Sequence, residues 1–146
     1  MIRKIKEEDK QDYLEMAKDF YASDAVDHNI PEEYFFDTFD ELMKSNCYAT
    51  GYIMEYENTT VGYALLAKTF SQEAGGMVLW IEELYVRPEY RSCGIGQEFF
   101  AYLRNHLPDN VKRIRLEVED SNKKAVSLYR RLGFESLPYS QMIIDL

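Results

Sequence analysis

The chain has 146 residues, a hydrophobic fraction of 46% and a formal net charge of −9 at pH 7. This length suffices to bury one core but is short for two, so we expect a single domain over residues 1–146. The negative charge opposes attraction to nucleic-acid phosphates and anionic membranes, because both need clustered Lys and Arg. No apolar run approaches the roughly 20 residues that cross a bilayer, so neither nucleic acid nor membrane is an expected partner.

The first residues, Met1 to Lys6, interleave charges with isoleucines and lack the apolar segment of a secretory signal. They predict a first strand in a cytoplasmic protein. Cys47 and Cys93 are too few for a disulfide framework, so we expect free thiols. His28 and His106 lie far apart in sequence, and without clustered Cys and His no metal is expected.

Two helices are expected after the first strand. Apolar residues recur at helical spacing in the first of them, and these are Tyr13, Ala17, Phe20 and Tyr21. The second helix is expected to start at Pro31, since proline is favoured in a first helical turn. Its inward positions are Phe35, Phe39 and Leu42.

A long β section follows. Cys47 to Tyr56 and Thr60 to Phe70 are rich in β-branched and aromatic residues. They flank Glu57-Asn58-Thr59, so a hairpin is expected. The run from Met77 to Val86 predicts a further strand.

The C-terminal half alternates helix and strand. Helical spacing runs from Ile95 to Leu107, and Arg113 to Val118 alternates as a strand. A second helical face begins at Ala125 and ends at Gly133. The last two segments are expected to close the sheet as short strands, and these are Phe134 to Leu137 and Gln141 to Leu146. The order β-α-α-β-β-β-α-β-α-β-β predicts an α/β fold with a mixed, mostly antiparallel sheet flanked by helices.

The segment from Val86 to Gly96 has the composition of an anion site between a strand and a helix. Main-chain N–H groups at a helix start converge on a phosphate, and glycines at 94 and 96 let the ligand approach closely. Arg91 adds a guanidinium group. An ordinary glycine-containing helix entry is the alternative. A dinucleotide fingerprint is excluded because Phe99 stands where a third Gly or Ala is needed.

Two runs carry a resemblance to a known family. Glu83 to Gly96 resembles the coenzyme A pyrophosphate loop of GNAT acetyltransferases, whose pattern is Arg/Gln-x-x-Gly-x-Gly/Ala. Arg115 to Phe134 resembles the family's later strand and helix, including Asn122, Ala125 and a Leu-Tyr pair before Gly-Phe. The two runs occur in the family's order and cover residues 77 to 137.

The resemblance implies acetyl-CoA as co-substrate. It implies that the main chain of Leu84 and Val86, with Tyr85 between them, pairs with the pantetheine arm like an added strand. It also implies that Asn122 hydrogen-bonds this arm beside Ala125, although a plain helix cap is the alternative role for Asn122. The implied pyrophosphate site consists of Arg91, Ser92, Cys93, Gly94, Ile95 and Gly96. Ser92-Cys93 departs from the frequent Gly-Lys or Gly-Gln pair and lacks its basic side chain.

The resemblance also implies the catalytic groups. Tyr129 is the candidate acid near the thioester sulfur, and core packing is the alternative role. Seven residues separate Asn122 from Tyr129, about two helical turns, so both face one groove. An ammonium with a pKa of about 10.4 must lose a proton before attack, so a base is also needed.

Glu82 and Glu83 are the candidate bases. We favour Glu82, because the segment resembles the Glu-Asp-aromatic-aromatic-Val run of spermidine/spermine-type members. A bulge in this strand favours Glu83 instead. An acid pair that only solvates the sheet is the remaining alternative.

A cationic amine is the expected acceptor. The family's first two helices and last hairpin loop line the acceptor side, which here means acidic Asp24 to Glu41 and the loop Ser136 to Ser140. Polyamines, aminoglycosides, lysine side chains and protein N-termini all satisfy this expectation. We expect a homodimer through the later strands. The alternative function is an acyl-CoA-binding sensor or regulatory module, which needs neither Tyr129 nor the two acids.

Overall fold

The computed structural model describes residues 1–24, 26 and 29–146, and within this part five strands form one sheet in the order β1-β2-β3-β4-β5. The strands are β1 (Ile2–Lys4), β2 (Ala49–Tyr56), β3 (Thr59–Ser71), β4 (Gly76–Val86) and β5 (Val111–Leu116). Neighbours pair antiparallel except β5, which runs parallel to β4. The helices are α1 (Lys10–Tyr21), α2 (Glu33–Lys44), α3 (Ile95–Asn105) and α4 (Lys123–Arg131), with short 3-10 turns η1 (Glu7–Asp9) and η2 (Pro88–Tyr90). The predicted mixed α/β fold and the element order from β1 to α4 are confirmed.

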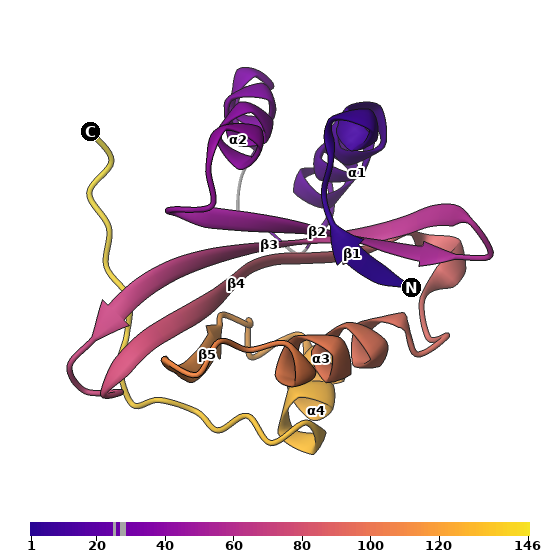
Figure 1. Cartoon of the computed structure of the whole chain (residues 1–146). Coiled ribbons are helices and arrows are strands. Elements are labelled where there is room, and N and C mark those ends of the chain that lie inside the picture. Colours follow the sequence, from indigo (N-terminus) through magenta and orange to yellow (C-terminus); the bar gives the residue numbers. More distant parts are fainter. Residues whose placement is uncertain (25, 27–28) are drawn as a thin grey trace. The chain divides into compact units, whose positions relative to one another are not determined.

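The described residues group into two compact units, Met1–Leu116 and Glu117–Leu146. In the first unit α1 and α2 cover one face of the sheet and α3 covers the other (Figure 1). The expected single domain over residues 1–146 stays a prediction. No helix in the described part of the chain is long and apolar enough to cross a membrane.

Aromatic side chains fill the core between the sheet and helices α1 and α2. The ring of Tyr13 lies 5.3 Å from the ring of Tyr63 and 5.7 Å from that of Phe39, measured between centroids. The buried members of this core are Tyr13, Met16, Ala17, Phe35, Phe39, Ile53, Tyr63 and Tyr85. Burying each large side chain contributes roughly 1.5–3 kcal/mol, so this packing fixes α1 against β3 and β4.

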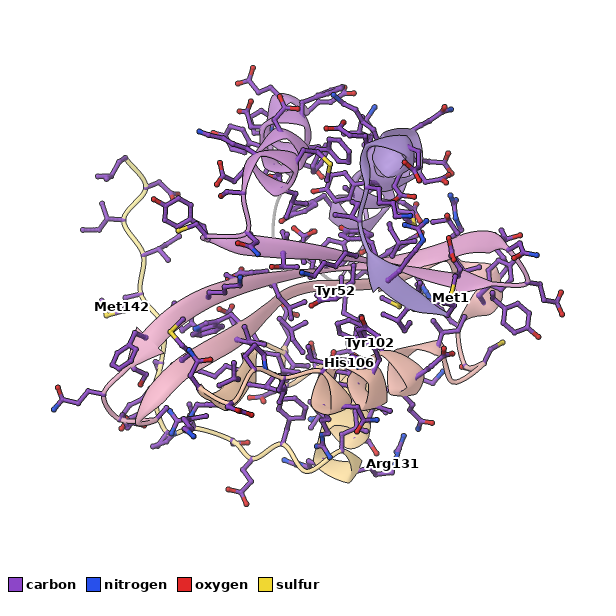
Figure 2. The ribbon with its side chains drawn as sticks, in the orientation of Figure 1. Met1, Tyr52, Tyr102, His106, Arg131 and Met142 are labelled. Carbon is purple, nitrogen blue, oxygen red and sulfur yellow. The ribbon has the colours of Figure 1, made fainter. Side chains whose placement is uncertain are left out.

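A second core lies between the sheet and α3. The buried side chains of α3 are Ile95, Phe99, Phe100 and Leu103. Tyr52 of β2 contacts Phe99 and Tyr102, with ring centroids 5.9 and 6.0 Å apart. Figure 2 labels Tyr102 and His106, whose rings stack with centroids 4.0 Å apart. His106 therefore packs along its own helix.

The hairpin between β2 and β3 turns at Glu57 and Asn58, whose φ angles are 47° and 62°. Positive φ at both central residues is the requirement of a type I′ turn, which matches the twist of a two-residue hairpin. The predicted hairpin is confirmed, with Thr59 already in β3.

The two strands expected after α4 were predicted wrongly. Neither Phe134 to Leu137 nor Gln141 to Leu146 forms a strand. The apolar side chains of the last segment are at least 76% exposed, namely Met142, Ile143, Ile144 and Leu146. An apolar run becomes a strand only where another strand pairs with it and one face is buried. The described residues of the unit Glu117–Leu146 contain no such partner strand.

Candidate active site

A bulge in β4 separates the neighbouring acids Glu82 and Glu83. Leu65 of β3 pairs with Glu83 and the next residue, Leu66, pairs with Ile81, so Glu82 is the extra residue. One inserted residue reverses the alternation of side chains along a strand. Glu83 is consequently buried on the sheet face that packs against α1, and Glu82 is exposed.

Both carboxylate oxygens of Glu83 accept a hydrogen bond from a tyrosine. The Tyr21 hydroxyl, from α1, donates to Oε1 at 2.6 Å, and the Tyr63 hydroxyl, from β3, donates to Oε2 at 2.6 Å. Burial raises the pKa of Glu83 above its usual value, and the two hydrogen bonds offset only part of that rise. A carboxyl with a raised pKa can take up a proton nearer neutral pH, which is what a general base needs.

Tyr21 and Tyr63 keep their protons at neutral pH. Burial is the largest cause that raises the pKa of each hydroxyl, and the negative charge of Glu83 raises both further. Glu82 adds to the rise at Tyr21, so its carboxylate also lies within electrostatic reach of that hydroxyl. The tyrosines therefore act as hydrogen-bond donors to Glu83.

The end of β4 has one edge available to a ligand. Pairing with β5 stops at Ile81, and among the described residues no strand pairs with this edge beyond it. The Arg87 N–H donates to the Val61 carbonyl on β3 at 2.8 Å. Successive strand residues direct their main-chain groups to opposite edges. The N–H and C=O groups of Leu84 and Val86 therefore point to the open edge, where the Val86 carbonyl accepts one hydrogen bond from Arg91 and keeps a second acceptor position.

The turn from β4 into α3 brings main-chain N–H groups together. Ser92 and Gly94 both have left-handed conformations, with φ of 63° and 82°, and α3 begins at the next residue. The first N–H groups of a helix have no partner within the helix. Apart from the adjoining backbone, nothing lies within 4 Å of the position that a Cβ would take at Gly94 or Gly96. An anion can therefore approach this main chain closely.

Arg91 lies against the end of β4. Its Nε donates to the Val86 carbonyl at 2.8 Å, and its guanidinium carbon lies 5.7 Å from the ring centroid of Tyr85. Exposed Cys93 contacts the Arg91 carbonyl through its Sγ at 3.6 Å. The predicted pyrophosphate residues thus form one continuous turn. Ser92 occupies a left-handed position that favours glycine, which explains why the family pattern often has glycine there.

In the second unit, Asn122 caps α4. Its Oδ1 accepts the Ala125 N–H at 3.2 Å, so the capping role is present, and the side-chain Nδ2 remains a donor. Tyr129 lies two turns later and packs edge-on against Phe134, with centroids 5.8 Å apart. Burial raises the pKa of Tyr129, so its hydroxyl is protonated at neutral pH.

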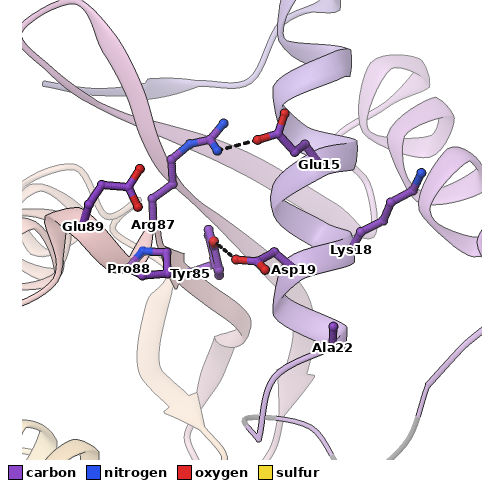
Figure 3. A pocket seen from close by; sticks show the side chains of 8 residues that line it. All are labelled: Glu15, Lys18, Asp19, Ala22, Tyr85, Arg87, Pro88 and Glu89. Atoms are coloured by element: carbon purple, nitrogen blue, oxygen red, sulfur yellow. Dashed lines mark hydrogen bonds and ion pairs between the residues drawn. The ribbon is translucent and has the colours of Figure 1, made fainter.

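A hollow of about 490 Å³ lies between α1 and the end of β4 (Figure 3). Arg87 donates to Glu15 at 2.6 Å across it, and the Tyr85 hydroxyl donates to Asp19. Burial and the bond to Asp19 raise the pKa of Tyr85 to about 12. The lining residues are Glu15, Lys18, Asp19, Ala22, Tyr85, Arg87, Pro88 and Glu89.

Sequence reasoning missed most of these contacts. Tyr21 was expected mainly as a core residue, and Tyr63 and Asp19 were not singled out. The one sequence signal for these contacts is the i, i+4 spacing of Glu15 and Asp19, which places both acids on one helix face. The spacing does not predict which residues of β4 contact that face.

Some expectations lie beyond what the structure describes. Asp27, in the acidic stretch, and His28, considered as a metal ligand, lie outside the described residues. Within the described part, no group of three or more His, Cys, Asp or Glu is placed to hold a metal ion. The expectation of no metal stays a prediction.

Comparison with known proteins decides the family. The profile of the acetyltransferase (GNAT) family matches residues 8–134. The chain belongs to this family. Thialysine N-epsilon-acetyltransferase of Mus musculus is 30% identical to the GNAT chain over 148 residues, covering 96% of the chain and 86% of the relative. Spermine/spermidine N(1)-acetyltransferase of Bacillus subtilis (strain 168) is 29% identical over 84 residues, covering 55% of each.

A solved structure agrees in fold. A predicted acetyltransferase with acetyl-CoA from Clostridium acetobutylicum has a TM-score of 0.79 at 19% identity, covering 99% of this chain and 95% of that one. This GNAT protein is thus an acetyl-CoA-dependent N-acetyltransferase. Acetyl-CoA is its co-substrate.

Proposed function

We propose that this GNAT protein acetylates a primary amine of a cationic small molecule by direct attack on acetyl-CoA in a ternary complex, with Glu83 as the base. The observation that carries the proposal is the buried Glu83 carboxylate with its raised pKa between two tyrosine hydroxyls. Relatives named for thialysine and for spermine or spermidine support an amine acceptor. A lysine side chain or protein N-terminus has the same reacting group.

The coenzyme side uses main-chain groups. Leu84 and Val86 pair with the pantetheine arm at the open edge of β4, in the manner of an added strand. Asn122 donates to the same arm from its Nδ2, beside Ala125. The pyrophosphate is held by the turn at the start of α3, formed by Arg91, Ser92, Cys93, Gly94, Ile95 and Gly96.

The reaction needs three proton movements. The acceptor ammonium, with a pKa of about 10.4, loses a proton to Glu83 and its nitrogen attacks the thioester carbonyl. The Leu84 N–H stabilises the oxygen that gains negative charge. Tyr129 gives a proton to the departing sulfur, whose pKa as a thiol is about 8.5, and the second proton that the nitrogen loses as the amide forms restores the Tyr129 hydroxyl. Glu82 is the alternative base because it is the residue that the sequence favoured.

Negative charge near the base favours a cationic acceptor. Glu82 is exposed beside Glu83, and Asp19 and Glu15 line the hollow on α1. Two of the acids on this side already form ion pairs, Glu32 with Lys18 and Glu15 with Arg87. An acceptor with a second positive charge gains attraction from the net negative potential around Glu83, and high salt screens this attraction.

The test is release of free coenzyme A from acetyl-CoA in the presence of spermidine, thialysine, lysine, an aminoglycoside or a short peptide. We expect turnover with at least one cationic amine. Tyr129→Phe lowers kcat at least tenfold with unchanged acetyl-CoA affinity, because it loses only the proton donor. Tyr48→Phe, at an exposed tyrosine outside the proposed site, leaves kcat unchanged.

Two outcomes contradict this proposal. Binding of acetyl-CoA without consumption of any amine favours an acyl-CoA sensor. Failure to bind acetyl-CoA eliminates the proposed role of Arg91 to Gly96.

A cytoplasmic location and a homodimer are also proposed, on the family resemblance. The later strands expected to form the dimer are not strands in the structure. Sedimentation at several protein concentrations measures the assembly directly.

A further inference from the structure

We propose that Tyr21 relays the acceptor's proton to Glu83, a role that rests on the proposed acetyl transfer to an amine. Glu83 is only 8% exposed, and each of its carboxylate oxygens accepts a tyrosine O–H at 2.6 Å. Because little of the carboxylate is exposed and both oxygens are already hydrogen-bonded to tyrosines, these hydroxyls provide a direct path for a proton from outside.

Tyr21 is the hydroxyl with a route to the exterior. Tyr63 is 1% exposed, and its ring is enclosed by the rings of Tyr13 and Tyr85 at 5.3 and 5.9 Å. Tyr21 is only half-buried and is the last residue of α1. Tyr21 is also within electrostatic reach of the exposed Glu82, which draws a cationic amine toward it.

Several ionisable groups surround this pair. Helix α2 contributes the uncharged ring of Phe35, 5.5 Å from that of Tyr21, and Asp19 is already engaged by the Tyr85 hydroxyl. The ionisable groups that act on Glu83 are Tyr13 and Tyr21 from α1, Tyr63 from β3 and the neighbouring Glu82, and the Tyr85–Asp19 pair lies on the far side of Tyr63. The tyrosines remain protonated at neutral pH, and Glu83 is the carboxylate to which the Tyr21 hydroxyl donates, so Glu83 receives the proton that Tyr21 passes on.

The relay moves two protons in one step. The ammonium N–H bond breaks as its proton binds the Tyr21 oxygen, and the original Tyr21 proton passes to Glu83 Oε1. The amine becomes neutral, Tyr21 is unchanged and Glu83 becomes a carboxylic acid. The neutral amine then attacks the thioester, and Glu83 returns its proton to solvent by the reverse path through Tyr21.

The pH dependence of kcat/KM with spermidine tests the relay. The wild-type protein gives a plateau between the pKa of Glu83 and that of the amine, because Glu83 removes the proton from the bound ammonium. Tyr21→Phe is about 100-fold slower at pH 7, the lower part of the range for general-base catalysis. Its rate rises about tenfold per pH unit toward the amine pKa of about 10.4, because only the neutral amine reacts.

Tyr63→Phe is the matched control. It removes the other hydrogen bond to Glu83 and so raises the pKa of that carboxyl, which moves the acid limb to higher pH. It keeps the plateau, with a loss of less than about tenfold at pH 7, because the relay remains. A Tyr21→Phe protein with a wild-type plateau, or a Tyr63→Phe protein that loses it, overturns the relay.

A measurement on the wild-type protein keeps the test independent of folding in the variants. In mixtures of light and heavy water, two protons moving together give a curved dependence of kcat on deuterium fraction, and a straight line overturns the relay. Acetyl-CoA affinity checks the fold of each variant. A wild-type protein that acetylates no amine defeats the proposed function and the relay with it, whereas an active wild type with a normal Tyr21→Phe profile defeats the relay alone.

Discussion

Asp9 is a second buried acid, and its surroundings are the opposite of those of Glu83. The Arg3 guanidinium donates to both Asp9 oxygens at 2.8 Å, and the Lys6 N–H donates to Oδ2 at 2.8 Å. The bonds to Arg3 are the largest cause that holds the pKa of Asp9 below its usual value. A cation beside the carboxylate keeps it ionised, whereas the tyrosines around Glu83 bring no charge. Asp9 is thus built for stability and Glu83 for proton uptake.

Asp9→Asn therefore lowers stability and leaves the chemistry intact. The loss at pH 7 is about 2 kcal/mol, because the change removes the charged hydrogen bonds from Arg3 to Asp9, while Arg3 keeps its ion pair with Glu55 at 2.7 Å. The folded pKa of Asp9 lies below the unfolded value of about 3.9, so its contribution is fully present above that value and disappears as pH falls through the folded pKa. Urea unfolding at pH 7 and at pH 3 measures this difference. If wild type and variant differ by the same free energy of unfolding at both pH values, the stabilising role of ionised Asp9 is contradicted.

The sequence was sufficient to name Glu82 and Glu83 but not to choose between them. Either acid could face the buried side of the strand until the position of the bulge is known. That position depends on how β3 pairs with β4. The contacts that distinguish Glu83 come from residues 62 and 20 positions away, Tyr21 and Tyr63. Local patterns carry no information on such distant pairs.

Among the elements, the start of α3 is where local sequence was most informative. Gly94 has a φ of 82°, which an L side chain rarely adopts, and the anion site depends on this backbone shape. Gly75, in the turn between β3 and β4, has the same φ of 82° and equally open surroundings. Gly94 lies in the loop that precedes α3, whereas Gly75 lies outside that loop.

Gly94→Ala and Gly75→Ala form a matched pair. Each destabilises the fold by about 1 kcal/mol, because alanine is strained at positive φ. Only Gly94→Ala also weakens acetyl-CoA binding, by about tenfold or 1.4 kcal/mol, because the N–H groups at the helix start move apart. Calorimetry of unfolding and of coenzyme binding separates the two effects. If both variants bind acetyl-CoA with equal affinity, the turn that contains Gly94 does not bind the phosphates.

Periodicity located the strands and the helices α1, α2 and α3 because each packs against a buried interior, and it also located α4, whose Tyr129 packs against Phe134. Helix α2 begins at Glu33 and not at Pro31, a small shift at a helix end. The strand expected at Gln141 to Leu146 has the right composition but no partner strand in its unit. Composition predicts that a segment suits a strand, and pairing decides whether one forms.

At the scale of the whole molecule, β4 carries both halves of the proposed reaction. Its inner face presents Glu83 to the tyrosines of α1 and β3, and its open edge presents the main chain of Leu84 and Val86. The bulge at Glu82 places Glu83 on the inner face. The edge at Leu84 and Val86 is open because pairing between β4 and β5 ends at Ile81. The net charge of −9 adds a field that favours a cationic acceptor over an anionic one.

The central claim is that Glu83 is the base for acetyl transfer to an amine. The most direct measurement compares kcat at pH 7 for Glu83→Gln and Glu82→Gln with the same acceptor, after acetyl-CoA binding has shown that both variants fold. We predict that Glu83→Gln loses about 100-fold or more, because an amide cannot accept the proton. Glu82→Gln is expected to raise KM for the cationic amine with less than a tenfold change in kcat. Full activity of Glu83→Gln with loss of kcat in Glu82→Gln contradicts the account and assigns the base to Glu82.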